Sequence, residues 1–207
     1  MLLSQIDKLT PTEQKGELRR MAREYRKSLD IQKKAEMDSA LCKSILSQKA
    51  VRTAKAVLMF SPVKGEPDIM PIADALLTEG VRVAFPISHT DTLTLDFRYV
   101  SSTKQLITGA YGIPEPPTDA PRLTDTDGTV CLVPALVYDK RGIRIGYGKG
   151  YYDRFLSSSQ AVSVGVAYSE LVTDTLPCEP TDVAVHMIIT ESGVILPNER
   201  PTLKATE

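Results

Sequence analysis

Hydrophobic positions recur with a helical period over the first 50 residues of this chain. Thr10 is expected to cap a helix, with Pro11 at its first position and Glu13 closing a capping box. Apolar side chains then return at helical spacing, at Leu18, Met21, Ala22, Tyr25 and Leu29. A second helical pattern covers about residues 31–48. The pattern therefore predicts two successive helices.

After this segment, short apolar runs of buried-strand type alternate with helical patterns. Strands are expected at 54–60, 81–87, 95–100, 129–138, 161–168, 183–190 and 193–196, and helices at 68–79 and from about Gly150. This alternation predicts an α/β fold, an α/β/α sandwich around a mainly parallel sheet. We expect one domain over residues 1–207, with a helical segment of about 10–50 packed on a core of about 54–197.

The Pro-rich stretch 111–128 is interpreted as a loop within that domain. A linker between two domains is the alternative, but the part before it would then have too few strands for a core of its own. The length of 207 residues with 42% hydrophobic content suits one ordinary domain.

Charge and cysteine content narrow the function classes. The 25 Lys and Arg residues balance 26 Asp and Glu residues, which argues against a nucleic-acid binder, so any anion site must be local. The three cysteines have no zinc-ligand spacing and are expected to be reduced and mostly buried. No leader pattern or run of about 18 apolar residues occurs. We expect a cytoplasmic monomer without membrane contact, with a dimer as the alternative.

The segment GIRIGYGKGYYDR, residues 142–154, is the strongest candidate for chemistry. Gly146, Gly148 and Gly150 alternate after a strand and before a helix, where backbone N–H groups can converge on a phosphate. Arg144 and Lys149 would supply the countercharge, with Arg154 as a further candidate. The segment is neither a Walker A nor a GxGxxG sequence, and a turn or bulge without a ligand is the alternative interpretation.

A second basic cluster is expected on the first helix. Lys15 and Arg19 are four residues apart, and with Arg26 they fall beside the apolar stripe, although a solvated basic face is the alternative. Three carboxylates, Glu66, Asp153 and Asp182, are each interpreted as caps or surface groups unless a phosphate site lies nearby, in which case they suit Mg²⁺. His89 and His186 show no triad pattern and are interpreted as structural or exposed.

Five segments in order then resemble the 5-formyltetrahydrofolate cyclo-ligase family, also called methenyltetrahydrofolate synthetases. They are KGELR, MFSPVKGEPD, YGIPEP, LVPALVYDKRGIRIGYGKGYYDRFL and TDVAVHMIITE, which together span nearly the whole chain. The resemblance implies Mg²⁺- and ATP-dependent conversion of 5-formyltetrahydrofolate to 5,10-methenyltetrahydrofolate, with release of ADP and phosphate. The implied route passes through a phosphorylated formyl group, an iminophosphate.

The resemblance also implies roles for individual residues. For ATP it implies Lys15, Arg19, Arg144, Ile145, Gly146, Tyr147, Gly148, Lys149, Gly150, Tyr151 and Tyr152. For the folate it implies Ser61, Glu66, Tyr147, Gly148, Lys149, Gly150 and Tyr151, and for catalysis Arg144, Lys149 and Tyr152. Asp153 and Asp182 match the carboxylates linked to magnesium.

Two departures from the family pattern are visible. Many members read H-D-x-x-x-D where this chain has Thr181, Asp182 and His186, and many have a further glycine at Lys149. Two other function classes stay open: a sugar-phosphate isomerase, which would need a general base and no ATP, and a folate- or nucleotide-binding regulator without turnover.

Overall fold

The structure, a computed structural model, describes residues 9–197. The predicted domain of residues 1–207 thus extends beyond the described part at both ends. The described helices are α2 (Pro11–Ser28), α3 (Ile31–Ser47), α4 (Lys49–Arg52), α5 (Met70–Thr78) and α6 (Tyr151–Ser157), with short 3-10 turns η1 (Thr103–Gln105), η2 (Ala110–Gly112) and η3 (Ser169–Leu171). None of these helices is long and apolar enough to cross a membrane.

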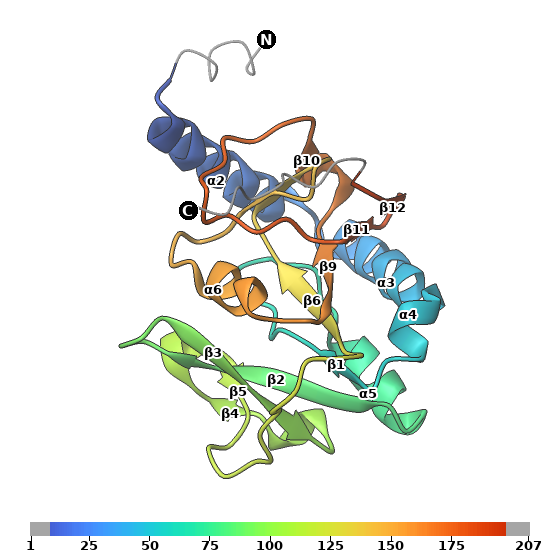
Figure 1. The fold of residues 1–207 in the computed structure, drawn as a ribbon. Coiled ribbons are helices and arrows are strands. Elements are labelled where there is room, and N and C mark those ends of the chain that lie inside the picture. The colour runs from blue at the N-terminus through green and yellow to red at the C-terminus, as the bar shows by residue number, and fades with distance from the viewer. Residues whose placement is uncertain (1–8, 198–207) are drawn as a thin grey trace.

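Seven strands form the central sheet in the order β12-β11-β9-β6-β1-β2-β3 (Figure 1). The five inner strands run parallel, and the edge strands β3 and β12 are antiparallel to their neighbours. The bounds are β1 (Ala56–Leu58), β2 (Arg82–His89), β3 (Thr94–Val100), β6 (Val130–Pro134), β9 (Val162–Val166), β11 (Met187–Thr190) and β12 (Gly193–Ile195). The prediction of a mainly parallel sheet is confirmed.

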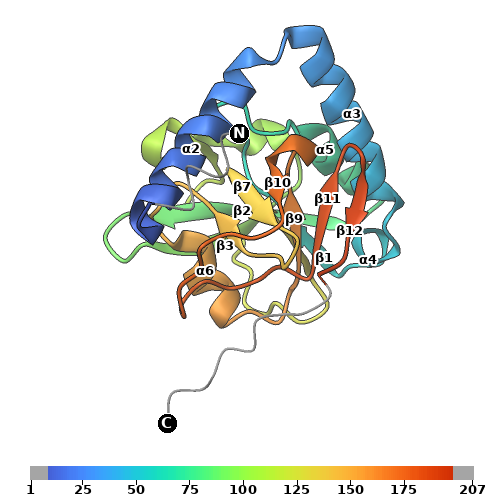
Figure 2. The same ribbon diagram turned by 90° about the horizontal axis from the view of Figure 1, so that it is seen from above.

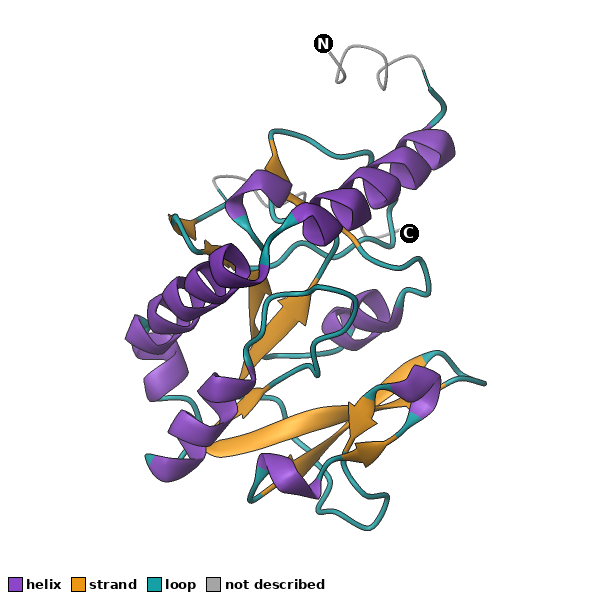
Figure 3. Ribbon diagram, turned by 180° about the vertical axis from the view of Figure 1, so that it is seen from behind, coloured by secondary structure: helices purple, strands orange, loops and turns teal. Residues whose placement is uncertain are grey.

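Helices cover both faces of this sheet. On one face α3 and α5 pack against side chains such as Val57 of β1 and Leu132 of β6, and on the other α6 packs against Leu58 and Cys131 of the same strands. Neighbouring residues thus face opposite layers, as the pleat of a strand requires. Figure 3 shows α3 and α5 from behind, and Figure 1 shows α6 in front of the sheet. The three layers agree with the predicted α/β/α sandwich.

The first helix begins as the sequence predicts. The Thr10 side chain accepts from the Glu13 N–H, and the Glu13 side chain accepts from the Thr10 N–H, so the capping box is present. Figure 2 shows α2 and α3 diverging from the short turn that joins them. The apolar face of α2, including Ala22, packs on Val137, Ile143 and Ile145, which lie outside the central sheet.

The apolar run 129–138 is expected to form one strand, but in the structure it forms two. It forms β6 and then β7 (Val137–Asp139), which pairs with β8 (Arg144–Ile145) and β10 (Val172–Thr173) in a separate sheet. Apolar content alone does not show where a buried run passes from one sheet to another. Beyond the central sheet, β4 (Ile107–Thr108) pairs with β5 (Pro114–Glu115) inside the Pro-rich region. The expected strand 183–190 is likewise shorter and begins at Met187.

The second sheet determines where the glycine segment lies. The chain leaves β6 at its carboxyl end, continues through β7 and turns back antiparallel in β8. Leu136 donates its N–H to the Ile145 carbonyl over 2.8 Å, so the end of β8 is held against the short segment that joins β6 to β7. The glycine segment therefore starts beside the carboxyl ends of the parallel strands, where ligands bind in folds of this type.

Candidate functional site

The glycine segment is a loop that leads into α6. Gly148 has φ of +93° and Gly150, the residue before the helix, has φ of +69°. L-amino acids with a side chain adopt these conformations only with strain, which explains glycine at both positions. Ile145 is buried at the base of the loop, while Lys149 is exposed and makes no hydrogen bond or ion pair through its side chain to the residues described. The predicted loop is thus open to solvent along its central residues.

Arg19 of α2 lies against this loop, and Lys15 of the same helix lies against Glu179 and Asp182; with Arg144 and Lys149 they form what we call the basic end of the site. Arg19 Nε donates to the Gly146 carbonyl over 2.9 Å, and a Cβ at Gly148 would lie 3.4 Å from the Arg19 guanidinium. Lys15 Nζ contacts Glu179 Oε1 at 2.9 Å and Asp182 Oδ2 at 3.3 Å. Although burial lowers the pKa of Lys15, the hydrogen bond to Glu179 and the Asp182 charge raise it overall.

Arg144 is held at the foot of the loop by two partners. Its Nη2 donates to Asp153 Oδ1 over 2.7 Å, and its Nη1 donates to the Val183 carbonyl over 2.7 Å. Asp153 Oδ1 also accepts from the Val183 N–H at 3.2 Å. The structure thus brings Arg144, Asp153 and the segment around Asp182 together, which the sequence analysis expected only through the resemblance.

Glu66 lies at the other end of the site, in a loop after β1. Its side chain is buried, and Oε2 accepts from the Val63 N–H at 3.0 Å. Arg26 of α2 and Tyr147 of the glycine loop are its neighbours: Arg26 Nη1 lies 3.9 Å from Glu66 Oε1 and 3.5 Å from the Tyr147 hydroxyl. We call Arg26, Glu66 and Tyr147 the Glu66 end of the site. Burial raises the pKa of both Glu66 and Tyr147, the latter to about 12.

Two further predicted residues connect this region to neighbouring loops. Ser61 is buried and donates its hydroxyl to the Pro114 carbonyl over 2.5 Å. The Tyr151 hydroxyl lies 3.2 Å from that of Tyr111 and 3.4 Å from the His89 carbonyl, at the tip of the β2–β3 hairpin. The predicted folate residues therefore border both the Pro-rich region and this hairpin.

Tyr152 occupies a different environment from its neighbours in the loop. Its ring packs against the two cores on either side of the central sheet, and its buried hydroxyl has no hydrogen-bond partner among the described residues. Burial raises its pKa well above the usual value, so the group is a neutral donor. Because this hydroxyl points inward, its predicted contact with ATP and its catalytic role stay predictions.

The two predicted metal ligands, Asp153 and Asp182, stay predictions. Within residues 9–197, no three His, Cys, Asp or Glu side chains lie close enough together to hold a metal ion. Asp153 and Asp182 each engage protein partners through a single oxygen, leaving Asp153 Oδ2 and Asp182 Oδ1 without a partner among those residues. Mg²⁺ usually takes one or two carboxylates together with substrate phosphates, and these two oxygens match that donor set.

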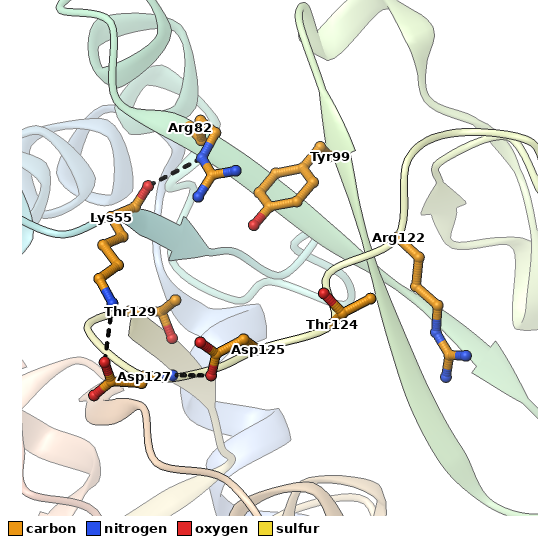
Figure 4. Close-up of a pocket in the computed structure, with 8 residues that line it drawn as sticks. All are labelled: Lys55, Arg82, Tyr99, Arg122, Thr124, Asp125, Asp127 and Thr129. Atoms are coloured by element: carbon orange, nitrogen blue, oxygen red, sulfur yellow. Dashed lines mark hydrogen bonds and ion pairs between the residues drawn. The ribbon is translucent and has the colours of Figure 1, made fainter.

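Two surface hollows lie elsewhere on the molecule. One of about 200 Å³ is lined by Lys55, Arg82, Tyr99, Arg122, Thr124, Asp125, Asp127 and Thr129 (Figure 4). Lys55, Arg82 and Thr129 precede or begin parallel strands, so this hollow is at the amino edge of the sheet. A second, of about 400 Å³, borders Val100 and the Pro-rich loop near Pro121. We place the site at the carboxyl edge because the loops and converging charges are there.

The profile of the 5-formyltetrahydrofolate cyclo-ligase family matches residues 11–191. The chain belongs to this family. The match includes α2, the loop after β1, the glycine segment and the strand β11, and it confirms the resemblance found in the sequence. It also confirms the prediction that the chain belongs to a family of ligases.

Individual relatives agree with this membership. The 5-formyltetrahydrofolate cyclo-ligase of Mycolicibacterium smegmatis is 32% identical over 152 residues, covering 69% of this chain and 77% of that protein. The Escherichia coli cyclo-ligase is 28% identical over 179 residues, covering 84% and 98%. The solved structure of Aquifex aeolicus 5,10-methenyltetrahydrofolate synthetase superimposes with a TM-score of 0.80 at 30% identity, covering 93% of this chain and 97% of that one.

Arg26 is a residue of the site to which neither the spacing nor the family resemblance assigned a role. Arg26 was placed beside the apolar stripe of α2 together with Lys15 and Arg19, but only those two were assigned to a ligand. The structure shows that Arg26 is the buried member of the three. Its position beside the apolar stripe was the available signal, because a charged side chain that turns toward the core needs partners inside the protein.

Proposed function

We propose that this protein converts 5-formyltetrahydrofolate to 5,10-methenyltetrahydrofolate with Mg²⁺ and ATP, releasing ADP and phosphate. The observation that carries the proposal is the pairing of two unlike ends at one edge of the sheet. The basic end presents Arg19 and Lys149 at a glycine loop and Lys15 beside Asp182, and the Glu66 end presents a buried carboxylate. A triphosphate and a substrate with hydrogen-bond donors are the ligands that such a pair would accept.

ATP would bind at the basic end and the folate at the Glu66 end. Lys15 and Arg19 would contact phosphates, with the segment 144–152 wrapped around the nucleotide. Glu66 would accept hydrogen bonds from the pterin side of the folate, and Ser61 would line the same region. Residues 147–151 would touch both ligands, because they run between the two ends.

The proposed chemistry needs no covalent intermediate with the protein. A formamide is a poor electrophile, so its oxygen first attacks the γ-phosphorus of ATP and ADP leaves. N10 of the folate then attacks the activated carbon and releases its proton to solvent, and loss of phosphate leaves the methenyl bridge. Arg144 and Lys149 would neutralise charge on the transferred phosphoryl group, and the loop would keep it in line with the formyl oxygen.

Asp153 and Asp182 would hold Mg²⁺ through their remaining oxygens. The ion would supply charge neutralisation on the triphosphate. Arg144 and Lys15 already pair with these two carboxylates, so both side chains are fixed before any ligand arrives. The cytoplasmic location and the monomeric state stay predictions.

The experiment is an assay of purified protein with 5-formyltetrahydrofolate, with and without Mg²⁺ and ATP. We expect the absorbance of methenyltetrahydrofolate to rise only when both are present, with one ADP released per product. Product formation without ATP would contradict the proposed activation. Binding of ATP or the folate without product would favour a regulator, and a lack of folate binding would favour a sugar-phosphate enzyme.

A further inference from the structure

Arg26 is buried at the point where three segments of the site meet. Its side chain is 1% exposed, and its Nη2 donates to the Ala135 carbonyl, at the end of β6, over 2.5 Å. Its Nη1 faces both Glu66 and the Tyr147 hydroxyl. One guanidinium therefore contacts the central sheet, the loop after β1 and the glycine loop.

The backbone of the β1 loop is shaped around this arginine. Lys64 and Gly65 have φ of +51° and +75°, so the loop turns sharply just before Glu66. A Cβ at Gly65 would lie 3.2 Å from Arg26 Cβ, which shows how closely the loop approaches α2 at this residue. The close approach puts the Glu66 carboxylate beside the guanidinium and leaves it little room to move.

The charge of Glu66 depends on its surroundings. Burial is the main influence and raises its pKa, while the Val63 N–H, the Arg26 charge, the Tyr147 hydroxyl and the Lys64 charge oppose it. Arg26 Nε has no hydrogen-bond partner among the described residues, so this buried arginine is not fully satisfied by the protein alone. Burying a cation with an unpaired donor beside a buried carboxylate lowers the stability of the fold, so we infer that the pair is retained for a functional reason.

We propose that Arg26 is a positioning residue that keeps Glu66 ionised and aimed at the folate. This inference rests on the proposed function, because it assigns Arg26 a task toward the proposed folate ligand of Glu66. An ionised carboxylate accepts hydrogen bonds through both oxygens, whereas a protonated one must donate from one of them. Arg26 thus sets the pH range in which the Glu66 end accepts the donors of a pterin ring.

The test compares Arg26→Gln and Arg26→Met, which remove the charge, with Arg26→Lys, which keeps it. For the uncharged variants we expect KM for 5-formyltetrahydrofolate to rise about tenfold or more at neutral pH, because one charge-assisted contact near the ligand is lost. The rise of that KM with falling pH should begin about one pH unit higher than in the wild type, since an opposite charge at this distance lowers a carboxyl pKa by that order. Arg26→Lys should retain the wild-type midpoint, and KM for ATP should change less than twofold in all three.

A direct titration makes the test independent of turnover. Protein carrying ¹³C at the glutamate carboxyl carbons would be titrated by NMR, with the Glu66 signal assigned from Glu66→Gln. We expect the midpoint of Glu66 to move upward in Arg26→Gln and Arg26→Met and to stay in place in Arg26→Lys. Arg23→Gln, an exposed arginine on the same helix, is the matched control and should change neither the titration nor KM.

The outcomes separate this inference from the proposed function. If the Glu66 midpoint moves while the wild type makes no methenyl product, Arg26 acts as inferred and the proposed function is wrong. A second outcome is that the wild type forms product, while in the uncharged variants kcat falls and KM rises for both ATP and the folate. If the titration midpoint of Glu66 is also unchanged in those variants, Arg26 has only a structural role. Should Arg26→Gln fail to fold, Arg26→Met keeps a side chain of similar length in the same space and carries the same expectations.

Discussion

The two ends of the site hold their charges in opposite ways. At the Glu66 end, the side chains of Arg26 and Glu66 are 1% and 3% exposed and 3.9 Å apart. At the basic end, Lys15 is 14% exposed and pairs with Glu179, which is 63% exposed. One pair is thus enclosed by protein, and the other opens to solvent.

This difference indicates which ligand each end can exchange. An ion pair open to solvent is worth about 0–1 kcal/mol, so Lys15 can exchange Glu179 for a phosphate at little cost while its contact with the less exposed Asp182 stays. Breaking a buried pair costs about 3–5 kcal/mol, because a charge is left without a partner in the interior. The basic end therefore suits a ligand whose charge changes during the reaction, and the Glu66 end suits rigid recognition of a single donor pattern.

The sharpest test of the basic end is Lys149→Ala. Lys149 is exposed and makes no ion pair with the described residues, so its removal should leave the fold intact. If it contacts the transferred phosphoryl group, kcat/KM should fall by roughly 10² or more. Steady-state rates and the melting temperature check this, with exposed Lys43→Ala on α3 as the control. An equal loss in both variants would mean that Lys149 has no part in the site.

The second test concerns the segment that carries Asp182 to the basic end. Gly142 has φ of +85°, and a Cβ there would meet the Val185 carbonyl at 2.7 Å. We expect Gly142→Ala to lower the free energy of unfolding by about 2–3 kcal/mol, from backbone strain and this contact together. Gly80→Ala is matched, since Gly80 has φ of +79° with nothing within 4 Å, and should cost about 1 kcal/mol. Urea unfolding of both variants measures the difference, and equal costs would mean that the Val185 contact is absent.

The spacing of residues in the sequence predicted more of the basic end than of the Glu66 end, because the features of the basic end are local. Capping residues, glycines and an i, i+4 pair of cations are local features, so Thr10, Gly150 and the placement of Lys15 beside Arg19 could be predicted from spacing. The Arg26–Glu66 pair joins residues 40 positions apart through the packing of α2 on a loop, and no local pattern encodes that contact. The spacing singled out Glu66 only as a carboxylate near the end of a strand, and its role toward the folate came from the family resemblance.

The fold shows the same limit. The alternation of strands and helices predicted the mainly parallel sheet, because periodicity reports burial on each element. The division of residues 129–138 between two sheets was missed, because both strands are buried and apolar alike. The sequence placed the glycine loop after a strand at the carboxyl edge of the sheet, but the turn back through β7 and β8 that leads to it is a tertiary feature that the pattern does not contain.

A third test measures how easily the basic end changes partners. Lys15→Ala should raise KM for ATP about tenfold, which corresponds to about 1.4 kcal/mol, because one phosphate contact is lost. Its effect on the free energy of unfolding should stay below about 1 kcal/mol, since the pair with Glu179 is open to solvent. Lys140→Ala breaks an exposed pair with Asp174 elsewhere and should leave KM for ATP unchanged. A stability loss well above 1 kcal/mol would show that the Lys15 pair is structural, and the contrast between the two ends would fail.

The smallest expected effect is at the residue that lies between the two ends. Tyr147→Phe removes the hydroxyl that is 3.5 Å from Arg26 Nη1 but keeps the ring that lies under Lys64. A long hydrogen bond contributes about 0.5 kcal/mol, so KM for 5-formyltetrahydrofolate should rise only two- to threefold. Tyr147→Leu also removes the ring and should raise it further, because the contact with Lys64 is lost as well. If KM for ATP rises and KM for the folate does not, the Tyr147 hydroxyl acts on the nucleotide. Tyr147 would then belong to the basic end and not to the Glu66 end.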